Sequence, residues 1–81
     1  MFSAEIFGQR LRTARKARGE KQEELGQLLG VGKSQISEIE RGTTSTSLER
    51  FALICRHYNV SADYLLGLTD EPKPYKRKKT E

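Results

Sequence analysis

Two short helix-like segments separated by three residues constrain the fold of this 81-residue chain more than any other feature. Apolar residues recur at helical spacing in Gln22–Leu29 and again in Lys33–Arg41, with Gly30-Val31-Gly32 between them. A glycine at such a corner can adopt a positive φ, which permits a sharp turn. The pattern therefore predicts two helices that cross at roughly 90–120°, the arrangement of a helix-turn-helix.

The packing at this corner also follows from the residue types. Gly26 supplies a small residue on the face of the first helix that approaches the second, and Val31 is expected to plug the corner. The angle between the two helices is expected to be filled by Leu25, Leu29, Ile36 and Ile39.

The remaining segments predict an all-α fold, a compact five-helix domain with no sheet. No proline precedes Pro72, and glycines or Ser/Thr clusters separate the apolar-periodic segments. The three further helices are expected over Ala4–Arg18, from Thr46 to Tyr58 and over Ala62–Leu66. Their predicted N-caps are Ser3, Thr46 (in a capping box with Glu49) and Ser61. The helix that ends at Tyr58 is expected to bury Leu48, Phe51, Ile54 and Cys55.

The net charge of +4 is unevenly distributed along the chain. Residues 1–71 carry ten basic and ten acidic side chains, whereas residues 72–81 carry five basic side chains and one acidic one. We expect residues 1–68 to form the folded domain and residues 69–81 to form a disordered basic tail. A basic total charge is therefore weak evidence for nucleic-acid binding here, and any such claim depends on particular side chains.

Several function classes are disfavoured by composition. With one cysteine, Cys55, and one histidine, His57, the chain offers no Cys/His zinc site, no internal disulfide and no nucleophile–base pair. We therefore expect no catalytic residue, no metal and no cofactor. The single cysteine is typical of a cytoplasmic protein, and no segment reaches the roughly 20 apolar residues of a membrane span.

In this helix-turn-helix segment the chain resembles the Cro/phage-repressor family, which is also called the family of xenobiotic-response-element regulators. The resemblance rests on the segment Gln22–Gly42, in which small, glycine and apolar positions match in register. It extends over about residues 5–67, including Phe7–Leu11 and Asn59–Leu66. Three departures stand out: Glu20 replaces an apolar residue, and Lys21 and Gly32 replace the usual Ser or Thr caps.

The resemblance implies a DNA-reading role for the helix Lys33–Arg41. With 100° per residue, its side opposite Ile36 and Ile39 faces outward, and the N-terminal part of such a helix enters the major groove. The expected base contacts are Lys33, Ser34, Ser37 and Glu38. The expected contacts to the DNA backbone are Gln22, Arg10, Arg41, Ser45 and Thr46. The family likeness also implies a partly buried ion pair between Arg15 and Glu40.

These observations predict a sequence-specific transcriptional regulator, a repressor that binds a pseudo-palindromic operator as a homodimer. The resemblance places the dimer contact near the last helix, at Tyr58, Tyr64, Leu65 and Leu68. The alternative is a protein-interaction module of the antitoxin or antirepressor type, whose main partner is another protein. The basic run Lys76–Lys79 is compatible with an accessory DNA arm, a dimer extension or a solubilising end.

Overall fold

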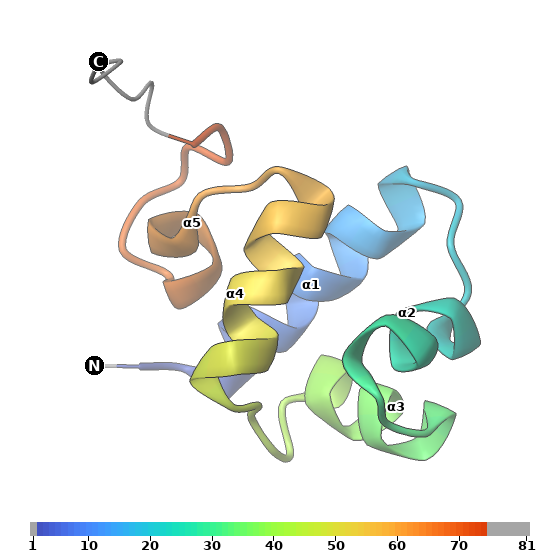
Figure 1. Ribbon diagram of the computed structural model, residues 1–81. Coiled ribbons are helices and arrows are strands. Elements are labelled where there is room, and N and C mark those ends of the chain that lie inside the picture. The colour runs from blue at the N-terminus through green and yellow to red at the C-terminus, as the bar shows by residue number, and fades with distance from the viewer. Residues whose placement is uncertain (1, 75–81) are drawn as a thin grey trace.

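The computed structural model describes residues 2–74, and this part of the chain folds into five α-helices without a strand (Figure 1). The helices are α1 (Ala4–Ala17), α2 (Gln22–Leu29), α3 (Lys33–Arg41), α4 (Leu48–Tyr58) and α5 (Ala62–Leu66). The all-α class and the five helices agree with the prediction from sequence. The first helix ends one residue earlier than expected, because Arg18 is already its C-cap.

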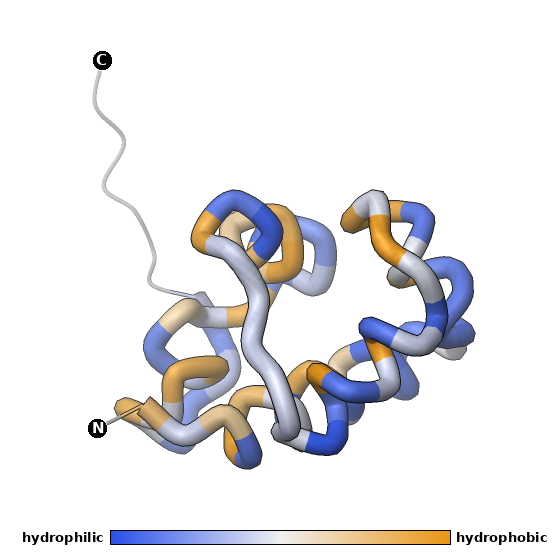
Figure 2. The backbone as a smooth tube through the Cα atoms, turned by 90° about the horizontal axis from the view of Figure 1, so that it is seen from below, coloured by the Kyte–Doolittle hydropathy of each residue, from blue (hydrophilic) through white to orange (hydrophobic). Residues whose placement is uncertain are grey.

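All five helices contribute to one hydrophobic core, and the longest helix, α1, packs against both α3 and α5. Hydrophobic and hydrophilic residues alternate along each helix, so each helix turns one side inward (Figure 2). The buried apolar side chains are Phe7, Leu11, Leu25, Leu29, Ile36, Ile39, Ile54, Tyr58 and Leu65. The core therefore ties the two helices of the predicted helix-turn-helix to the rest of the domain.

Two serines begin helices as expected, but the start of α4 differs from the prediction. Ser3 Oγ and Ser61 Oγ accept hydrogen bonds from backbone N–H groups three residues later. At α4 the cap is Ser47, whose Oγ accepts from Arg50 N at 3.2 Å, so the predicted cap at Thr46 is wrong by one residue. Leu48, which was expected to be buried, is 83% exposed at the start of this helix.

Arg10 holds the segment that follows α5 against α1. Its guanidinium donates to the carbonyl oxygens of Tyr64 and Thr69, pairs with Asp70 at 3.0 Å, and lies 4.3 Å from the centre of the Tyr64 ring. A backbone bond from Ser61 N to Pro72 O adds to this attachment. Residues 69–72, which belong to the segment expected as a tail, thus contact the folded helices. Residues 75–81 of that segment lie outside the described residues.

The N-terminus of α2 offers a stabilising substitution. Lys21 is its N-cap residue and has no side-chain acceptor, although its backbone N–H already donates to Glu24 Oε1 at 2.7 Å. Lys21→Ser would add a hydroxyl that accepts from the Glu24 N–H and complete a capping box. We expect a gain of about 0.5–2 kcal/mol in unfolding free energy, measured by urea denaturation. Lys21→Ala, which adds no acceptor, is the control and should bring no such gain.

Candidate nucleic-acid interface

The corner between α2 and α3 has the geometry that the glycines predict. Gly30 ends α2 with φ 74°, and the chain turns into α3 through Val31 and Gly32. Val31 is partly buried against the core, while a Cβ on Gly26 would lie only 2.6 Å from the Val31 carbonyl oxygen. A larger residue at Gly26 would therefore push the turn away from α2, so this glycine is required for the corner.

The outward side of α3 is free of contacts with the core. Ile36 and Ile39 are fully buried, whereas the opposite side of α3 faces solvent. Of the residues expected to contact DNA from this helix, Lys33, Ser34, Glu38 and Arg41 are exposed, and Ser37 is partly exposed. The helix thus presents a polar surface that could enter a groove.

Two side-chain contacts lie on this surface. Arg41 Nη1 donates to Ser37 Oγ at 2.8 Å, one turn earlier on α3. Lys33 Nζ lies 3.7 Å from Glu23 Oε2, and both side chains are more than half exposed. An exposed ion pair of this kind contributes little to stability, so Lys33 can exchange Glu23 for another acceptor at small cost.

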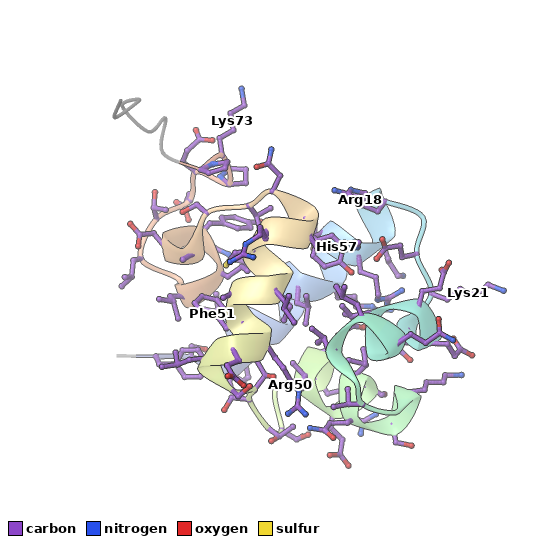
Figure 3. The ribbon with its side chains drawn as sticks, viewed as in Figure 1. Arg18, Lys21, Arg50, Phe51, His57 and Lys73 are labelled. Atoms are coloured by element: carbon purple, nitrogen blue, oxygen red, sulfur yellow. The ribbon has the colours of Figure 1, made fainter. Side chains whose placement is uncertain are left out.

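An open hollow of about 510 Å³ lies on the surface where α1, the start of α2 and α3 come together. Its lining combines five cationic, two anionic and two neutral polar side chains: Arg12, Arg15, Lys21, Gln22, Glu23, Lys33, Ser37, Glu40 and Arg41. Lys21, at the edge of this hollow, extends away from the body of the domain (Figure 3). Exposed cations beside the N-terminus of a helix suit the phosphate groups of a nucleic-acid backbone.

The floor of the hollow is a buried ion pair. Arg15 Nε donates to Glu40 Oε2 at 2.6 Å and Arg15 Nη2 to Glu40 Oε1 at 3.0 Å, and the two side chains are only 8% and 3% exposed. The Gln22 amide also donates to Glu40 Oε1, at 3.0 Å. The hydrogen bond to Glu40 raises the pKa of Arg15, so the guanidinium stays charged. This pair joins α1, α2 and α3 at the base of the candidate interface.

Glu20 has a role that sequence reasoning missed. Its carboxylate accepts from Tyr58 Oη at 2.7 Å and contacts His57 Nε2 at 2.7 Å, while Arg18 donates to the His57 carbonyl (Figure 3). Burial alone would raise the pKa of Glu20, but the bonds from Tyr58 and His57 outweigh it and lower that pKa. The only signal in the sequence was the acidic residue at an apolar position of the family pattern.

Not every expected backbone contact is available for DNA. Ser45 is exposed, but Thr46 Oγ1 is buried and has no hydrogen-bond partner within the described residues. Arg10 is engaged with the segment after α5, where three of its guanidinium hydrogens are already used in hydrogen bonds. The reason in both cases is tertiary packing, which the helical periodicity does not report.

Two of the four residues expected in a dimer contact are buried within the single chain. Tyr58 is 7% exposed and Leu65 is 0% exposed, so both belong to the core of a single chain. Tyr64 is partly buried beneath Arg10. Leu68 is 69% exposed and remains available for contact with a partner.

Comparison with known proteins agrees with this geometry. The profile described as "Helix-turn-helix" matches residues 11–65, which include all of α2, α3 and α4. This chain belongs to the Cro/C1-type helix-turn-helix family. The P22 c2 repressor, solved in complex with a synthetic operator, superposes with a TM-score of 0.71 at 33% identity, covering 78% of this chain and 96% of that one.

Two curated relatives of this helix-turn-helix protein come from bacteria. The uncharacterized HTH-type transcriptional regulator YobD of Bacillus subtilis is 39% identical over 69 residues, covering 85% of this chain and 62% of YobD. Antitoxin PezA of Streptococcus pneumoniae is 31% identical over 62 residues, covering 76% of this chain and 39% of PezA. The chain therefore spans less than two thirds of either relative.

Proposed function

We propose that this chain is a sequence-specific DNA-binding transcriptional repressor of the cytoplasm that reads its operator with α3. The observation that carries the proposal is the outward side of α3, which is exposed and polar over its N-terminal turns while the opposite side is fixed in the core. A helix held in this way can enter the major groove without rearrangement of the domain.

The residue chemistry assigns roles along this helix. Lys33 can donate to guanine O6 and N7, Ser34 and Ser37 can donate or accept, and Glu38 can accept from cytosine N4. Gln22 and Arg41 lie in the hollow beside α3, where Gln22 keeps one amide hydrogen free after its bond to Glu40. We propose that these two side chains and the exposed Ser45 contact the phosphate backbone of DNA. Arg10 and the buried Thr46 hydroxyl are not part of this proposed contact.

A homodimer would give the protein its operator symmetry. Two recognition helices separated by about 34 Å occupy successive major grooves on one side of a duplex, which requires a pseudo-palindromic site. The P22 c2 repressor, which resembles this chain over 96% of its own length, was solved bound to an operator, and this supports the same mode of binding. Occupancy of such a site would block transcription by excluding polymerase. No cofactor and no enzymatic activity form part of the proposal.

Alanine substitutions on α3 test the assignment. Lys33→Ala and Ser34→Ala should each reduce affinity for the selected operator by a factor of about 5–150, which corresponds to about 1–3 kcal/mol for a lost base contact. Binding to unrelated duplexes should change much less, so specificity falls. The measurement is a fluorescence-anisotropy titration against an operator selected from random duplexes and against a scrambled sequence.

Arg12→Gln is the matched control, because Arg12 is an exposed cation of the hollow beside the assigned phosphate contacts, and we add it to those contacts, but it lies on α1, away from the base-reading side. Loss of a phosphate contact should weaken binding to both duplexes by a similar factor. It should also reduce the slope of log affinity against log salt concentration by about one. If Lys33→Ala and Ser34→Ala behave like Arg12→Gln, α3 does not read bases and the proposal is wrong.

A second candidate function is supported by the likeness to antitoxin PezA, which is 31% identical over the matched segment. An antitoxin-type module would hold a protein partner as its main role. Co-purification of a stoichiometric partner encoded beside this chain, with binding to DNA that does not depend on sequence, would favour this function over the repressor.

A further inference from the structure

We propose that Glu23 on α2 is a specificity-determining residue, which holds Lys33 of α3 for guanine and away from the phosphate backbone. This role rests on the proposed function, because it refines how the α3 surface distinguishes one duplex from another. It belongs to a side chain that the base and backbone contacts proposed above leave out. Glu23 is a positioning residue, since it acts on DNA through Lys33.

Glu23 is an anion on a surface that otherwise suits phosphate. Two carboxylates line the hollow between α1, α2 and α3, and the other one, Glu40, is only 3% exposed and bonded to Arg15. Glu23 is 58% exposed and lies in the first turn of α2. The exposed cations that line the same hollow are Arg12, Lys21, Lys33 and Arg41. An exposed carboxylate at this place repels phosphate, so its presence calls for a role other than contact with the DNA backbone.

Stabilisation of α2 alone does not explain this carboxylate. An acidic side chain in the first turn of a helix interacts favourably with the helix dipole, and α2 has two of them, Glu23 and Glu24. Glu24 also accepts a hydrogen bond from Lys21 N. Glu23 differs from Glu24 because its carboxylate contacts a cation of the next helix, Lys33. The two adjacent residues therefore separate a role within the helix from a role across the corner.

The contact between Glu23 and Lys33 joins the two helices of the helix-turn-helix. Lys33 Nζ lies 3.7 Å from Glu23 Oε2, and Lys33 is the first residue of α3. Because α2 and α3 pack closely around their corner, the carboxylate stays within reach of the ammonium group (Figure 1). The pKa of Glu23 is lowered by a hydrogen bond from its own backbone N–H and by the charge of Lys33, so the carboxylate is anionic near pH 7.

The ammonium group of Lys33 can contact Glu23 and a base at the same time. A lysine has three donors, and guanine presents two acceptors in the major groove, O6 and N7. At 3.7 Å the contact with Glu23 is longer than a hydrogen bond, and it uses at most one donor when it closes. Guanine and Glu23 together therefore match the three donors of Lys33, and the ion pair need not break on a guanine.

A phosphate group offers Lys33 no such combination. A phosphate oxygen is itself anionic, so Lys33 reaches it either by leaving Glu23 or by bringing two anions together. Loss of an exposed ion pair weakens such a contact by about 1.4–5-fold. On a guanine, by contrast, Glu23 has already restricted the long, flexible Lys33 side chain, which reduces the entropy lost on binding. Glu23 should thus weaken binding to any duplex more than binding to one whose guanine faces Lys33.

Glu23→Gln tests this role, because it removes the charge and keeps the size of the side chain. Affinity for a scrambled duplex should rise, since Lys33 becomes free to contact phosphates, and the slope of log affinity against log salt concentration should steepen by about one. Affinity for the operator selected from random duplexes should rise less. We expect the ratio of the two affinities to fall about threefold or more, measured by fluorescence anisotropy over a range of salt concentrations.

Glu24→Gln is the matched control, because it removes the same charge from the adjacent residue and its amide oxygen can still accept from Lys21 N. Both variants also remove one acidic side chain from the first turn of α2, so a change in helix stability affects them alike. The affinity ratio of Glu24→Gln should stay within twofold of that of the unmodified chain. Equal ratios for Glu23→Gln and Glu24→Gln would mean that charge alone matters, and the role of Glu23 would be refuted.

A double variant shows whether Glu23 acts through Lys33. In a Lys33→Ala background there is no ammonium group to position, so the addition of Glu23→Gln should leave the affinity ratio within twofold. A fall as large as in the Lys33 background would mean that Glu23 acts on DNA by another route, contrary to the proposal.

Selection from random duplexes tests the identity of the base. The unmodified chain should enrich guanine at one position of each half-site, and Lys33→Ala should leave that position random. Glu23→Gln should recover the same operator with weaker enrichment of this guanine. If the position that Lys33→Ala randomises carries a base other than guanine, the pairing of three donors with three acceptors does not apply and the proposal is wrong.

NMR titration of the Glu23 carboxyl group checks the ion pair without DNA. Lys33→Ala should raise the pKa of Glu23, because the charge of Lys33 is one of the causes that lower it. An unchanged pKa would show that the two side chains do not interact in solution and would exclude a positioning role.

Two outcomes of the titrations separate this role from the proposed function. An unmodified chain that binds its operator and the scrambled duplex equally overturns the repressor proposal, and the role of Glu23 falls with it. An unmodified chain that prefers its operator, together with a Glu23→Gln variant that keeps the same preference, overturns the role of Glu23 alone.

Discussion

Replacing Glu40 by leucine is expected to lower the free energy of unfolding by about 3–5 kcal/mol, the largest loss we expect from any single substitution. The substitution leaves the Arg15 guanidinium buried opposite an apolar side chain, since Glu40 accepts two of its three hydrogen bonds and the third goes to the neutral Glu20 carbonyl oxygen. It also removes the acceptor of the Gln22 amide. Stability is typically about 0.05–0.15 kcal/mol per residue, or about 4–12 kcal/mol for a chain of 81 residues, so the loss removes a quarter of the stability or more. Urea denaturation followed by circular dichroism measures the effect.

The double variant Arg15→Met, Glu40→Leu distinguishes a stranded charge from a lost contact. Replacing both members of a buried pair by apolar residues of similar volume is often neutral or stabilising. We therefore expect the double variant to recover most of the loss of Glu40→Leu. A double variant as unstable as Glu40→Leu alone would show that the pair stabilises the domain through its own attraction, contrary to this account.

The local features of this fold could be predicted from sequence because their causes are local. Apolar spacing placed α2 and α3 within the chain, and Gly30 placed the corner between them. The predicted start of α4 was wrong by one residue, because local chemistry does not distinguish Thr46 from Ser47. The two are adjacent hydroxyl residues that both suit an N-cap. Leu48 was also expected in the core, but it lies about 120° around α4 from the buried Ile54 and is 83% exposed.

The features that could not be predicted depend on residues that are far apart in the sequence. Arg10 donates hydrogen bonds to the carbonyl oxygens of Tyr64 and Thr69, and Glu20 accepts one from Tyr58. Helical periodicity along the sequence does not report either contact. The same limit explains why Tyr58 and Leu65 were expected at a dimer contact although both are buried. A tyrosine or a leucine near a helix end suits a core as well as an interface, and only the tertiary packing decides between them.

Gly8→Ala should destabilise the domain by about 1–3 kcal/mol, although alanine normally favours a helix over glycine by about 1 kcal/mol. Gly8 lies on the side of α1 that faces the end of α3. A Cβ there would overlap the Ile39 carbonyl oxygen and come within 2.7 Å of the Glu40 carbonyl oxygen. Because both obstacles are backbone atoms, α3 itself would have to move away from α1. The melting temperature should fall by about 4–8 °C for each kcal/mol, measured by differential scanning calorimetry.

Gly32→Ala is the control for Gly8→Ala, since its φ is −81° and no atom lies within 4 Å of the added Cβ. It should lower the melting temperature by less than Gly8→Ala does, because it costs only the preference of an N-cap for glycine over alanine, about 1 kcal/mol, and displaces no helix. The displaced α3 of Gly8→Ala should also bind the operator more weakly than the Gly32→Ala protein at temperatures where both are folded. Equal melting temperatures for the two variants would mean that the close approach of α1 and α3 at Gly8 does not set the position of the recognition helix.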